Sequence, residues 1–256
     1  MHSGHFGALP AFIVLYAALY SAFGIASPFW PRFFEWRGLT AEQLGLLLGF
    51  GTISRLIAGP LVGRISDLLG TLRGVLAICA ACAGSVALAL LIAKGFWPLL
   101  AIHVAQAAAL APTTTLADAL AVSAATRPAK GFEYGWVRGS ASAAFVLGTL
   151  FAGQILSFGD LSSIVWMHAG MLACAVLCMR LVPGLEMRSP EAADDKTTLL
   201  GGVRRLFRLA LFRRVVLVAA LVSGSHAMHD AFAVIRWNEA GLGSGPISVV
   251  VDLRSR

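Results

Sequence analysis

The stretch that decides the fold spans residues 74–93 and reads GVLAICAACAGSVALALLIA, with no charged side chain among its 20 residues. A helix of about 20 apolar residues is long enough to cross the hydrocarbon core of a bilayer. Every position of the stretch is small or apolar, whereas a strand of an outer-membrane barrel alternates apolar and polar residues. The stretch therefore predicts a transmembrane helix.

Comparable stretches recur along almost the whole chain. Only 13% of the residues are charged, which is about half the share found in soluble domains. No Lys or Arg precedes the first stretch and no cleavage site follows it, so we expect it to be retained as a span. The sequence thus predicts an all-α integral membrane protein with six further spans, at residues 8–30, 42–63, 97–122, 136–158, 161–182 and 214–236.

Lys and Arg are distributed unevenly between the two sides of the predicted spans. Thirteen accompany the connections after spans 2, 4 and 6, and four lie on the opposite side. Cytoplasmic connections are rich in these residues, so we expect a multi-pass protein of the cell inner or plasma membrane with a cytoplasmic N-terminus. The formal net charge of +7 lies in short clusters, which fits anionic lipid headgroups as a partner and argues against nucleic acid.

Three parts are predicted along the chain. Residues 8–182 would form a six-span bundle, residues 183–213 a cytoplasmic linker, and residues 214–256 a seventh span with a tail. Residues 247–251 resemble the start of an eighth span. A truncated or frameshifted reading frame is the simplest expectation for this end, and a natural short tail is the alternative.

The predicted linker contains an amphipathic segment. Apolar residues from Leu199 to Leu211 recur at helical spacing, and Arg204, Arg205 and Arg208 fall on another face. This pattern is typical of a helix that lies along the inner headgroups of a membrane.

The connection after span 2 reads GRISDLLGTLR from Gly63 to Arg73. It resembles the loop signature of the major facilitator superfamily, G-x-x-x-D-x-x-G-[RK]-x-[RK], through Gly63, Asp67, Gly70 and Arg73. These four residues would form a gating loop. Gly63 would let helices approach closely, Asp67 would cap or attract a helix N-terminus, Gly70 would turn the chain, and Arg73 would supply a partner charge. Thr71 stands where that family usually has a basic residue.

Further stretches resemble the phenylpropionate permease branch of this superfamily. The resemblance covers about residues 20–250 and implies a twelve-span, proton-coupled permease, of which this chain holds the first seven spans. Residues 140–142 are Ser, Ala and Ser, where the branch usually has Trp-Gly-Ser. The similar stretches are Gly24–Trp30, Gly38–Gly49, Asp118–Ala121, Tyr134–Arg138, Gly224–Ala227 and Trp237–Leu242.

Charged side chains inside the predicted spans are the main candidates for function, since each costs at least about 2.5 kcal/mol to insert. Arg55 lies near the centre of span 2, where it can attract a carboxylate substrate or form a structural ion pair. Asp118 on span 4 and Arg138 at the start of span 5 lie at comparable depth. We expect them to pair, either as a proton-coupling element or as a static bridge between helices.

Span 7 carries a second candidate for proton coupling. His226 and Asp230 are four residues apart, so they share one helix face near the membrane midplane. Such a pair can hold and pass a proton, and a hydrogen-bonded, packed histidine is the alternative. His103 and His168 have no acid in register and are expected to serve packing.

Glycine and proline patterns suggest how the spans pack. Gly45 with Gly49, and Gly135 with Gly139, form G-x-x-x-G motifs that predict close helix contacts, as do Gly59 and Gly63. Pro112 is expected to kink span 4, because proline cannot donate a helical hydrogen bond.

A secondary transporter is the leading hypothesis. The substrate would be a small organic solute such as an aromatic carboxylate, taken up with protons by alternating access between spans 2, 4, 5 and 7. Nucleosides or sugars are the second choice of substrate. A fragment without activity of its own is a further alternative, which a missing C-terminal half or a homodimer partner would complete.

Other functions are excluded by missing chemistry. A retinal protein needs a lysine in its last span, and the three lysines, Lys94, Lys130 and Lys196, lie outside the predicted spans. No metalloprotease or serine-hydrolase motif occurs, so we expect no enzyme and no cofactor. The four cysteines sit at helical spacing within apolar runs, which favours packing over metal binding.

Overall fold

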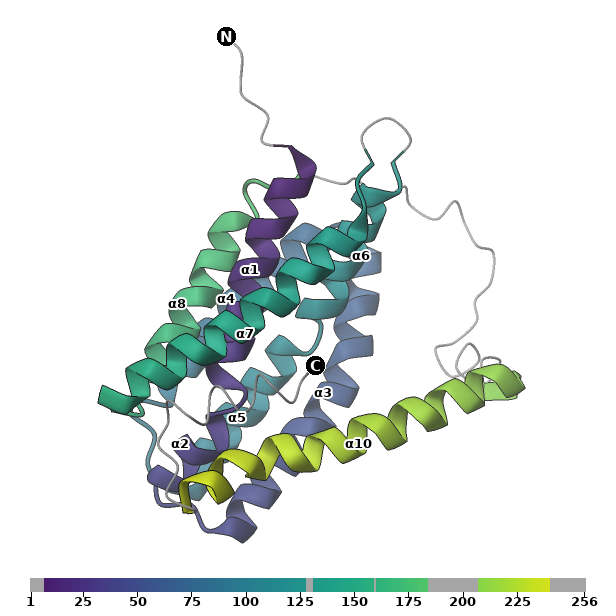
Figure 1. The fold of residues 1–256 in the computed structure, drawn as a ribbon. Helices are drawn as coiled ribbons and strands as arrows, with labels where there is room; N and C mark the ends of the chain where they lie inside the picture. Colours follow the sequence, from purple (N-terminus) through teal and green to yellow (C-terminus); the bar gives the residue numbers. More distant parts are fainter. Residues whose placement is uncertain (1–6, 128–130, 159, 184–206, 240–256) are drawn as a thin grey trace.

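The computed structural model of the chain describes residues 7–127, 131–158, 160–183 and 207–239, with side chains in the last segment only for residues 207–226 and 236. Within these ranges the regular elements are helices, and none is a strand (Figure 1). Five helical segments, one of them broken at Pro112, are long and apolar enough to cross a membrane. The prediction of an all-α membrane protein is confirmed.

The first predicted span, residues 8–30, forms one helix, and a second helix begins at its last residue. Helix α1 runs from Ala8 to Ala26, and a short helix α2 follows from Trp30 to Trp36. Pro31 lies in the first turn of α2, where its missing N–H leaves no helical bond unmade. The side chain of Arg37, just after α2, donates to the carbonyl oxygens of Leu90 at 2.9 Å and Leu91 at 3.2 Å.

The second and third predicted spans are continuous helices with well-defined ends. Helix α3 runs from Ala41 to Leu69 and begins with a capping box between Thr40 and Gln43. It ends at Gly70, whose φ of +63° is a left-handed conformation that favours glycine. Thr71 then caps helix α4, Leu72–Ala89, by accepting a hydrogen bond from the backbone N–H of Gly74 at 3.2 Å.

The fourth predicted span is interrupted at Pro112, as expected. Helix α5 runs from Phe96 to Leu110, and helix α6 from Thr113 to Ala125. The hydroxyl of Thr113 donates to Leu110 O at 2.7 Å and that of Thr115 to Pro112 O at 3.0 Å. Pro112 O also accepts from the backbone N–H of Leu116 at 2.9 Å, so the hydroxyl of Thr115 adds a second donor there.

The remaining elements are helices α7, Tyr134–Phe158, α8, Ser163–Cys178, and α10, Ala210–Glu239. Helix α8 is shorter than the predicted span of 161–182. Helix α10 covers the predicted seventh span and begins inside the predicted linker. It contacts α2, and its described side chains up to His226 are exposed apart from the partly exposed Phe212 (Figure 1). The predicted amphipathic segment and the tail lie largely or wholly outside the described residues.

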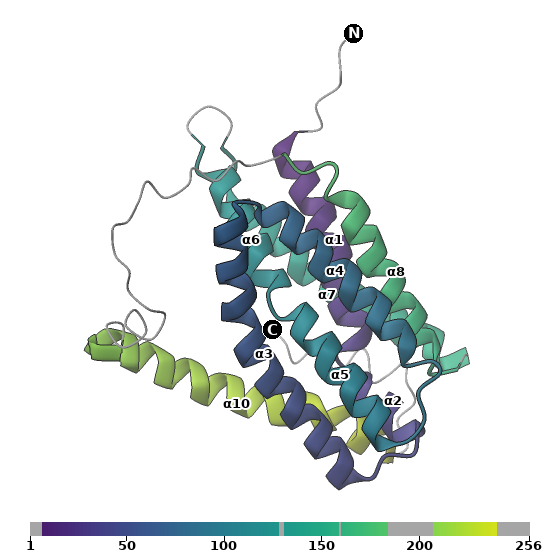
Figure 2. The same cartoon turned by 180° about the vertical axis from the view of Figure 1, so that it is seen from behind.

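Helix α1 is the centre of the bundle and packs against α7 and α8 (Figure 2). Its contact with α7 depends on two glycines. A Cβ atom added to Gly24 would lie 2.1 Å from Phe145 O, and one added to Gly148 would lie 2.8 Å from Ser21 O. The hydroxyl of Thr149 donates to Gly24 O at 2.9 Å across the same contact.

The predicted G-x-x-x-G contacts are not found among the described helices. An added Cβ at any of these glycines would meet no atom within 4 Å, so none of them lies at a close helix contact. The expectation was wrong because the motif gives spacing along one helix but does not say which face meets a neighbour. The glycines concerned are Gly45, Gly49, Gly59, Gly63, Gly135 and Gly139.

Helix α3 has the least buried span in the bundle. Its most apolar window is 11% buried, compared with 39–50% for the other four candidate spans. It packs mainly on α5, and apolar side chains such as Leu56 and Ile57 are exposed on its other faces. An apolar surface of this kind suits contact with lipid or with further transmembrane helices.

Candidate functional site

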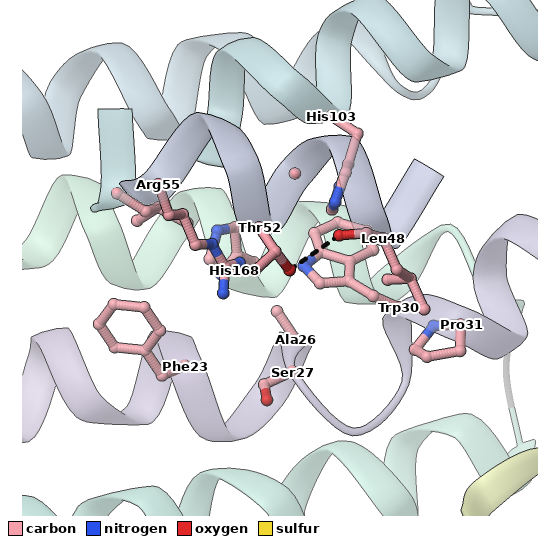
Figure 3. A pocket seen from close by; sticks show the side chains of 12 residues that line it. Phe23, Ala26, Ser27, Trp30, Pro31, Leu48, Thr52, Arg55, His103 and His168 are labelled. Atoms are coloured by element: carbon pink, nitrogen blue, oxygen red, sulfur yellow. Dashed lines mark hydrogen bonds between the residues drawn. The ribbon is translucent and has the colours of Figure 1, made fainter. Parts of the chain in front are cut away.

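A pocket of about 280 Å³ lies between helices α1, α2, α3, α5 and α8 (Figure 3). Its volume is close to the lower end of the range for small-molecule sites, about 300–1,000 Å³. Aromatic walls come from Phe23 and Trp30, and polar groups come from α3, α5 and α8. The substrate was expected between spans 2, 4, 5 and 7, whereas this pocket is lined by spans 1, 2, 4 and 6.

Within the part of the chain that the structure describes, Arg55 is the one Lys or Arg that lines this pocket, and no carboxylate lines it. It lies near the middle of α3, and in Figure 3 it is drawn at one end of the pocket with Phe23. Among the described residues, no acidic side chain is within ion-pair distance of it. Both predicted roles of Arg55, attraction of a carboxylate substrate and a structural ion pair, therefore stay predictions.

The two histidines of the pocket differ in their hydrogen bonds. His168 is fully buried, with Nδ1 2.9 Å from Ala22 O and Nε2 3.1 Å from the Gln106 side-chain nitrogen. A carbonyl only accepts and an amide nitrogen only donates, so His168 is neutral with its proton on Nδ1. It joins α8 to α1 and α5, in agreement with the packing role expected for it.

His103 also lines the pocket but is not bonded in this way. Its side chain is buried, with 5% exposed, and its Nδ1 has no hydrogen-bond partner in the described part of the chain. The ring packs edge-on against Phe34 with centroids 5.3 Å apart. Figure 3 shows it pointing into the pocket, so packing alone does not describe its position.

Asp118 and Arg138 are brought together, with Oδ1 and Nη1 3.7 Å apart. Two tyrosine hydroxyls also donate to Asp118 Oδ1, from Tyr16 at 2.7 Å and from Tyr134 at 2.8 Å. Arg138 in turn donates to the hydroxyl of Tyr20 and lies 5.3 Å from the centre of its ring. We call these five residues, from α1, α6 and α7, the Asp118 cluster.

One face of α1 connects the Asp118 cluster with the pocket. The rings of Tyr16 and Tyr20 stack at 5.6 Å, and those of Tyr20 and Phe23 lie 6.0 Å apart. Phe23 lines the pocket. A continuous row of aromatic rings therefore leads from the carboxylate to the pocket.

The residues of the predicted gating loop have varied surroundings. Gly70 turns the chain, as expected. The guanidinium of Arg73 donates a hydrogen bond, 2.8 Å long, to the carbonyl oxygen of Val182, which follows the end of α8. Its hydrogen-bond partner is therefore a backbone carbonyl. Asp67 is exposed, and Gly63 is at no close helix contact.

The candidates on α10 are only partly described. His226 is exposed, and its Nδ1 lies 3.0 Å from Val222 O of its own helix. The side chain of Asp230 lies outside the described residues, so the predicted pair stays a prediction.

Several residues of the site were not found from the sequence. Tyr16, Tyr20 and Phe23 recur at spacings of four and three, which places aromatic rings on one helix face. That spacing was a usable signal. No sequence signal indicated the hydrogen bond between Gln106 and His168, because it depends on how two helices that are distant in sequence pack together.

Comparisons with known proteins agree with this architecture. The MFS_1 like family matches residues 11–255. The chain is 28% identical, over 93% of its length, to a protein named "Probable 3-phenylpropionic acid transporter" from Escherichia coli (strain K12), covering 62% of that protein. It is 24% identical, over 72% of its length, to an uncharacterized transporter from Bacillus subtilis (strain 168), covering 44% of it.

The chain thus spans less than two thirds of the length of these two relatives. Both are named as transporters and neither as an enzyme, which agrees with the expectation from sequence. The family match extends over nearly the whole chain and covers the described helices except the first three residues of α1. This multi-pass, all-α membrane protein belongs to the MFS_1 like family of the major facilitator superfamily.

Proposed function

We propose that the chain provides the substrate-binding bundle of a proton-coupled transporter for a small aromatic carboxylate. The observation that carries this proposal is the pocket, in which the guanidinium of Arg55 is accompanied by the rings of Phe23 and Trp30 and by no acidic side chain. A guanidinium binds a carboxylate through two parallel hydrogen bonds. Aromatic walls favour a flat apolar body on the ligand.

The relatives support this class of substrate only by name, since one of them is called a probable 3-phenylpropionic acid transporter. The pocket argues in the same direction from its own chemistry. A sugar or nucleoside carries no charge to match a cation inside the bilayer, whose insertion costs at least about 2.5 kcal/mol. An anionic ligand gives that cation a partner.

We assign proton coupling to the Asp118 cluster. Ionised Asp118 accepts from two tyrosines and faces Arg138, and each of these contacts stabilises the negative charge. Protonation would weaken all of them together and loosen the contact between α1, α6 and α7. In this scheme a movement of α1 that follows protonation of Asp118 would reach the pocket through the row of aromatic rings during alternating access.

The predicted organisation remains part of the proposal. Arg73 and Val182 join at the end of the bundle where α3 ends and α7 starts, and that end also carries Arg64, Arg127 and Arg138 (Figure 1). This distribution supports a cytoplasmic N-terminus in a cell membrane. A second bundle, or a second copy of the chain, would cover the exposed apolar faces of α3 and α7.

Binding to the purified full chain in detergent tests the proposal directly. Titration calorimetry with 3-phenylpropionate should give saturable binding, and Arg55→Gln should weaken it about 10- to 100-fold, the range for a hydrogen-bonded charge. Arg64→Gln is the matched control, because Arg64 lies on the same helix outside the pocket. Equal affinities of wild type and Arg55→Gln would contradict the proposal.

Proton coupling needs a separate measurement. In proteoliposomes, uptake of radiolabelled 3-phenylpropionate should rise when the outside is made acidic, and Asp118→Asn should abolish this dependence while binding persists. Uptake that is equally pH-dependent in Asp118→Asn would remove the carboxylate from the mechanism. Competition by uncharged sugars or nucleosides, with Arg55→Gln retaining affinity for them, would favour the alternative substrate class.

A further inference from the structure

His103 is the buried polar side chain of the pocket that the proposed carboxylate site leaves unused. Only 5% of the residue is exposed, and its side chain points into the pocket (Figure 3). Its Nδ1 has no hydrogen-bond partner among the described residues. Buried polar atoms without partners are rare in native proteins and each costs about 1–3 kcal/mol. His168 on α8, which also lines the pocket, shows the contrast, since both of its ring nitrogens are hydrogen-bonded.

Neighbouring residues fix the position of the His103 ring. Phe34 packs edge-on against one side of the ring. Gly51 also lies against the ring, since an added Cβ there would lie 2.6 Å from His103 Nε2 and 2.9 Å from Cδ2. Only a residue without a side chain at position 51 leaves room for the imidazole in this place.

Arg55 and His103 are drawn apart from each other in the pocket (Figure 3). Figure 3 draws Arg55 with Phe23 towards one end and His103 with Trp30 towards the other. Between them the hydroxyl of Thr52 donates its hydrogen to Leu48 O at 2.9 Å, which leaves its oxygen free to accept. A ligand whose carboxylate meets Arg55 would therefore place its far end beside an imidazole.

We propose that His103 is a specificity-determining residue, and that the preferred substrate is an aromatic carboxylate with a hydrogen-bonding substituent, such as a phenolic hydroxyl, on its ring. This inference rests on the proposed carboxylate site at Arg55. A neutral imidazole has one donor and one acceptor nitrogen, and a hydroxyl can meet either. A purely apolar end would leave the imidazole unpaired, and sites built with such groups discriminate against ligands that lack the partner.

The test compares ligands that differ by one hydroxyl. Purified full chain is titrated with 3-phenylpropionate and with its three monohydroxylated ring isomers. One hydrogen bond corresponds to about a tenfold gain, so at least one isomer should bind wild type about tenfold more tightly than the parent. His103→Phe should remove this preference, so that the variant binds 3-phenylpropionate and its hydroxylated isomers with affinities within about threefold of one another.

Gly51→Ala provides a second variant that retains the imidazole but displaces it, and it should also reduce the preference. Gly49→Ala is the matched control, since an added Cβ there meets no atom within 4 Å on the same helix. His103→Gln keeps a donor and an acceptor and should retain part of the preference. Circular dichroism and the melting temperature establish that each variant is folded.

The outcomes separate the two proposals. If 3-phenylpropionate binds through Arg55 but no hydroxylated isomer binds more tightly, or if His103→Phe keeps the preference, the role of His103 is overturned and the carboxylate site stands. If neither the parent nor any isomer binds wild type, the proposed function fails and the inference about His103 fails with it.

Discussion

The contact between α1 and α7 allows a quantitative prediction for Gly24→Ala. The new Cβ would lie 2.1 Å from Phe145 O, whereas uncharged heavy atoms rest at about 3.5 Å, so the helices must separate by about 1 Å or more. Separation would break two hydrogen bonds across the contact, Thr149 Oγ1 to Gly24 O at 2.9 Å and Ser21 Oγ to Ala144 O at 3.2 Å.

The magnitude follows from these two effects. Overpacking of a close contact costs about 1–3 kcal/mol, and a hydrogen bond between transmembrane helices contributes about 0.6 kcal/mol. Gly24→Ala should therefore lower the free energy of unfolding by about 2–4 kcal/mol. Alanine gains up to about 1 kcal/mol over glycine through helix propensity alone, which would reduce the measured loss.

Unfolding of the full chain by SDS in mixed micelles, followed by far-UV circular dichroism, gives this quantity. Gly139→Ala on α7 is the matched control, because its Cβ would meet no atom within 4 Å and only the propensity gain should remain. A Gly24→Ala protein as stable as Gly139→Ala would refute the close crossing of α1 and α7.

Three further changes test other parts of the structure. Gly70→Ala should cost about 1 kcal/mol of stability in the same assay, because φ there is +63°. Gln106→Leu removes the donor to buried His168 and should cost about 1–3 kcal/mol, visible as a lower melting temperature; an unchanged value would mean that His168 is satisfied otherwise. Tyr16→Phe removes one of the two tyrosine donors to Asp118 and should weaken the dependence of uptake on the external pH. A pH profile identical to wild type would exclude Tyr16 from the coupling site.

The positions of the helices were largely predictable from the sequence. Uncharged runs of about 20 residues mark them, because a bilayer requires this length and a helix satisfies its own backbone. The break in span 4 was also predictable, because Pro112 has no backbone N–H to donate to the preceding helical turn. The ends were less so: α3 extends to Leu69, past the predicted end at residue 63, because Gly70 and Thr71 set the boundary.

The site was only partly predictable. Arg55, Asp118 and Arg138 could be found because charge within an apolar span is conspicuous in the sequence. Their surroundings could not be found, because Tyr16 is 102 residues from Asp118 in the chain and only the packing of α1 brings them together. The use of glycine shows the same limit, since a close contact requires a partner surface that no local motif records.

The break at Pro112 divides span 4 into two rigid segments with different attachments. Segment α5 carries His103 and packs on α3 and α4, whereas segment α6 carries Asp118 and packs on α4 and α7. A continuous helix would have to tilt as a whole, whereas two helices joined at a break can change their relative angle while one of them keeps its contacts. The joint lies between the two chemical groups, six residues before the acid and nine after the imidazole. The break at Pro112 therefore separates the group that we propose to take up a proton, Asp118, from the group that we propose to contact the substrate, His103.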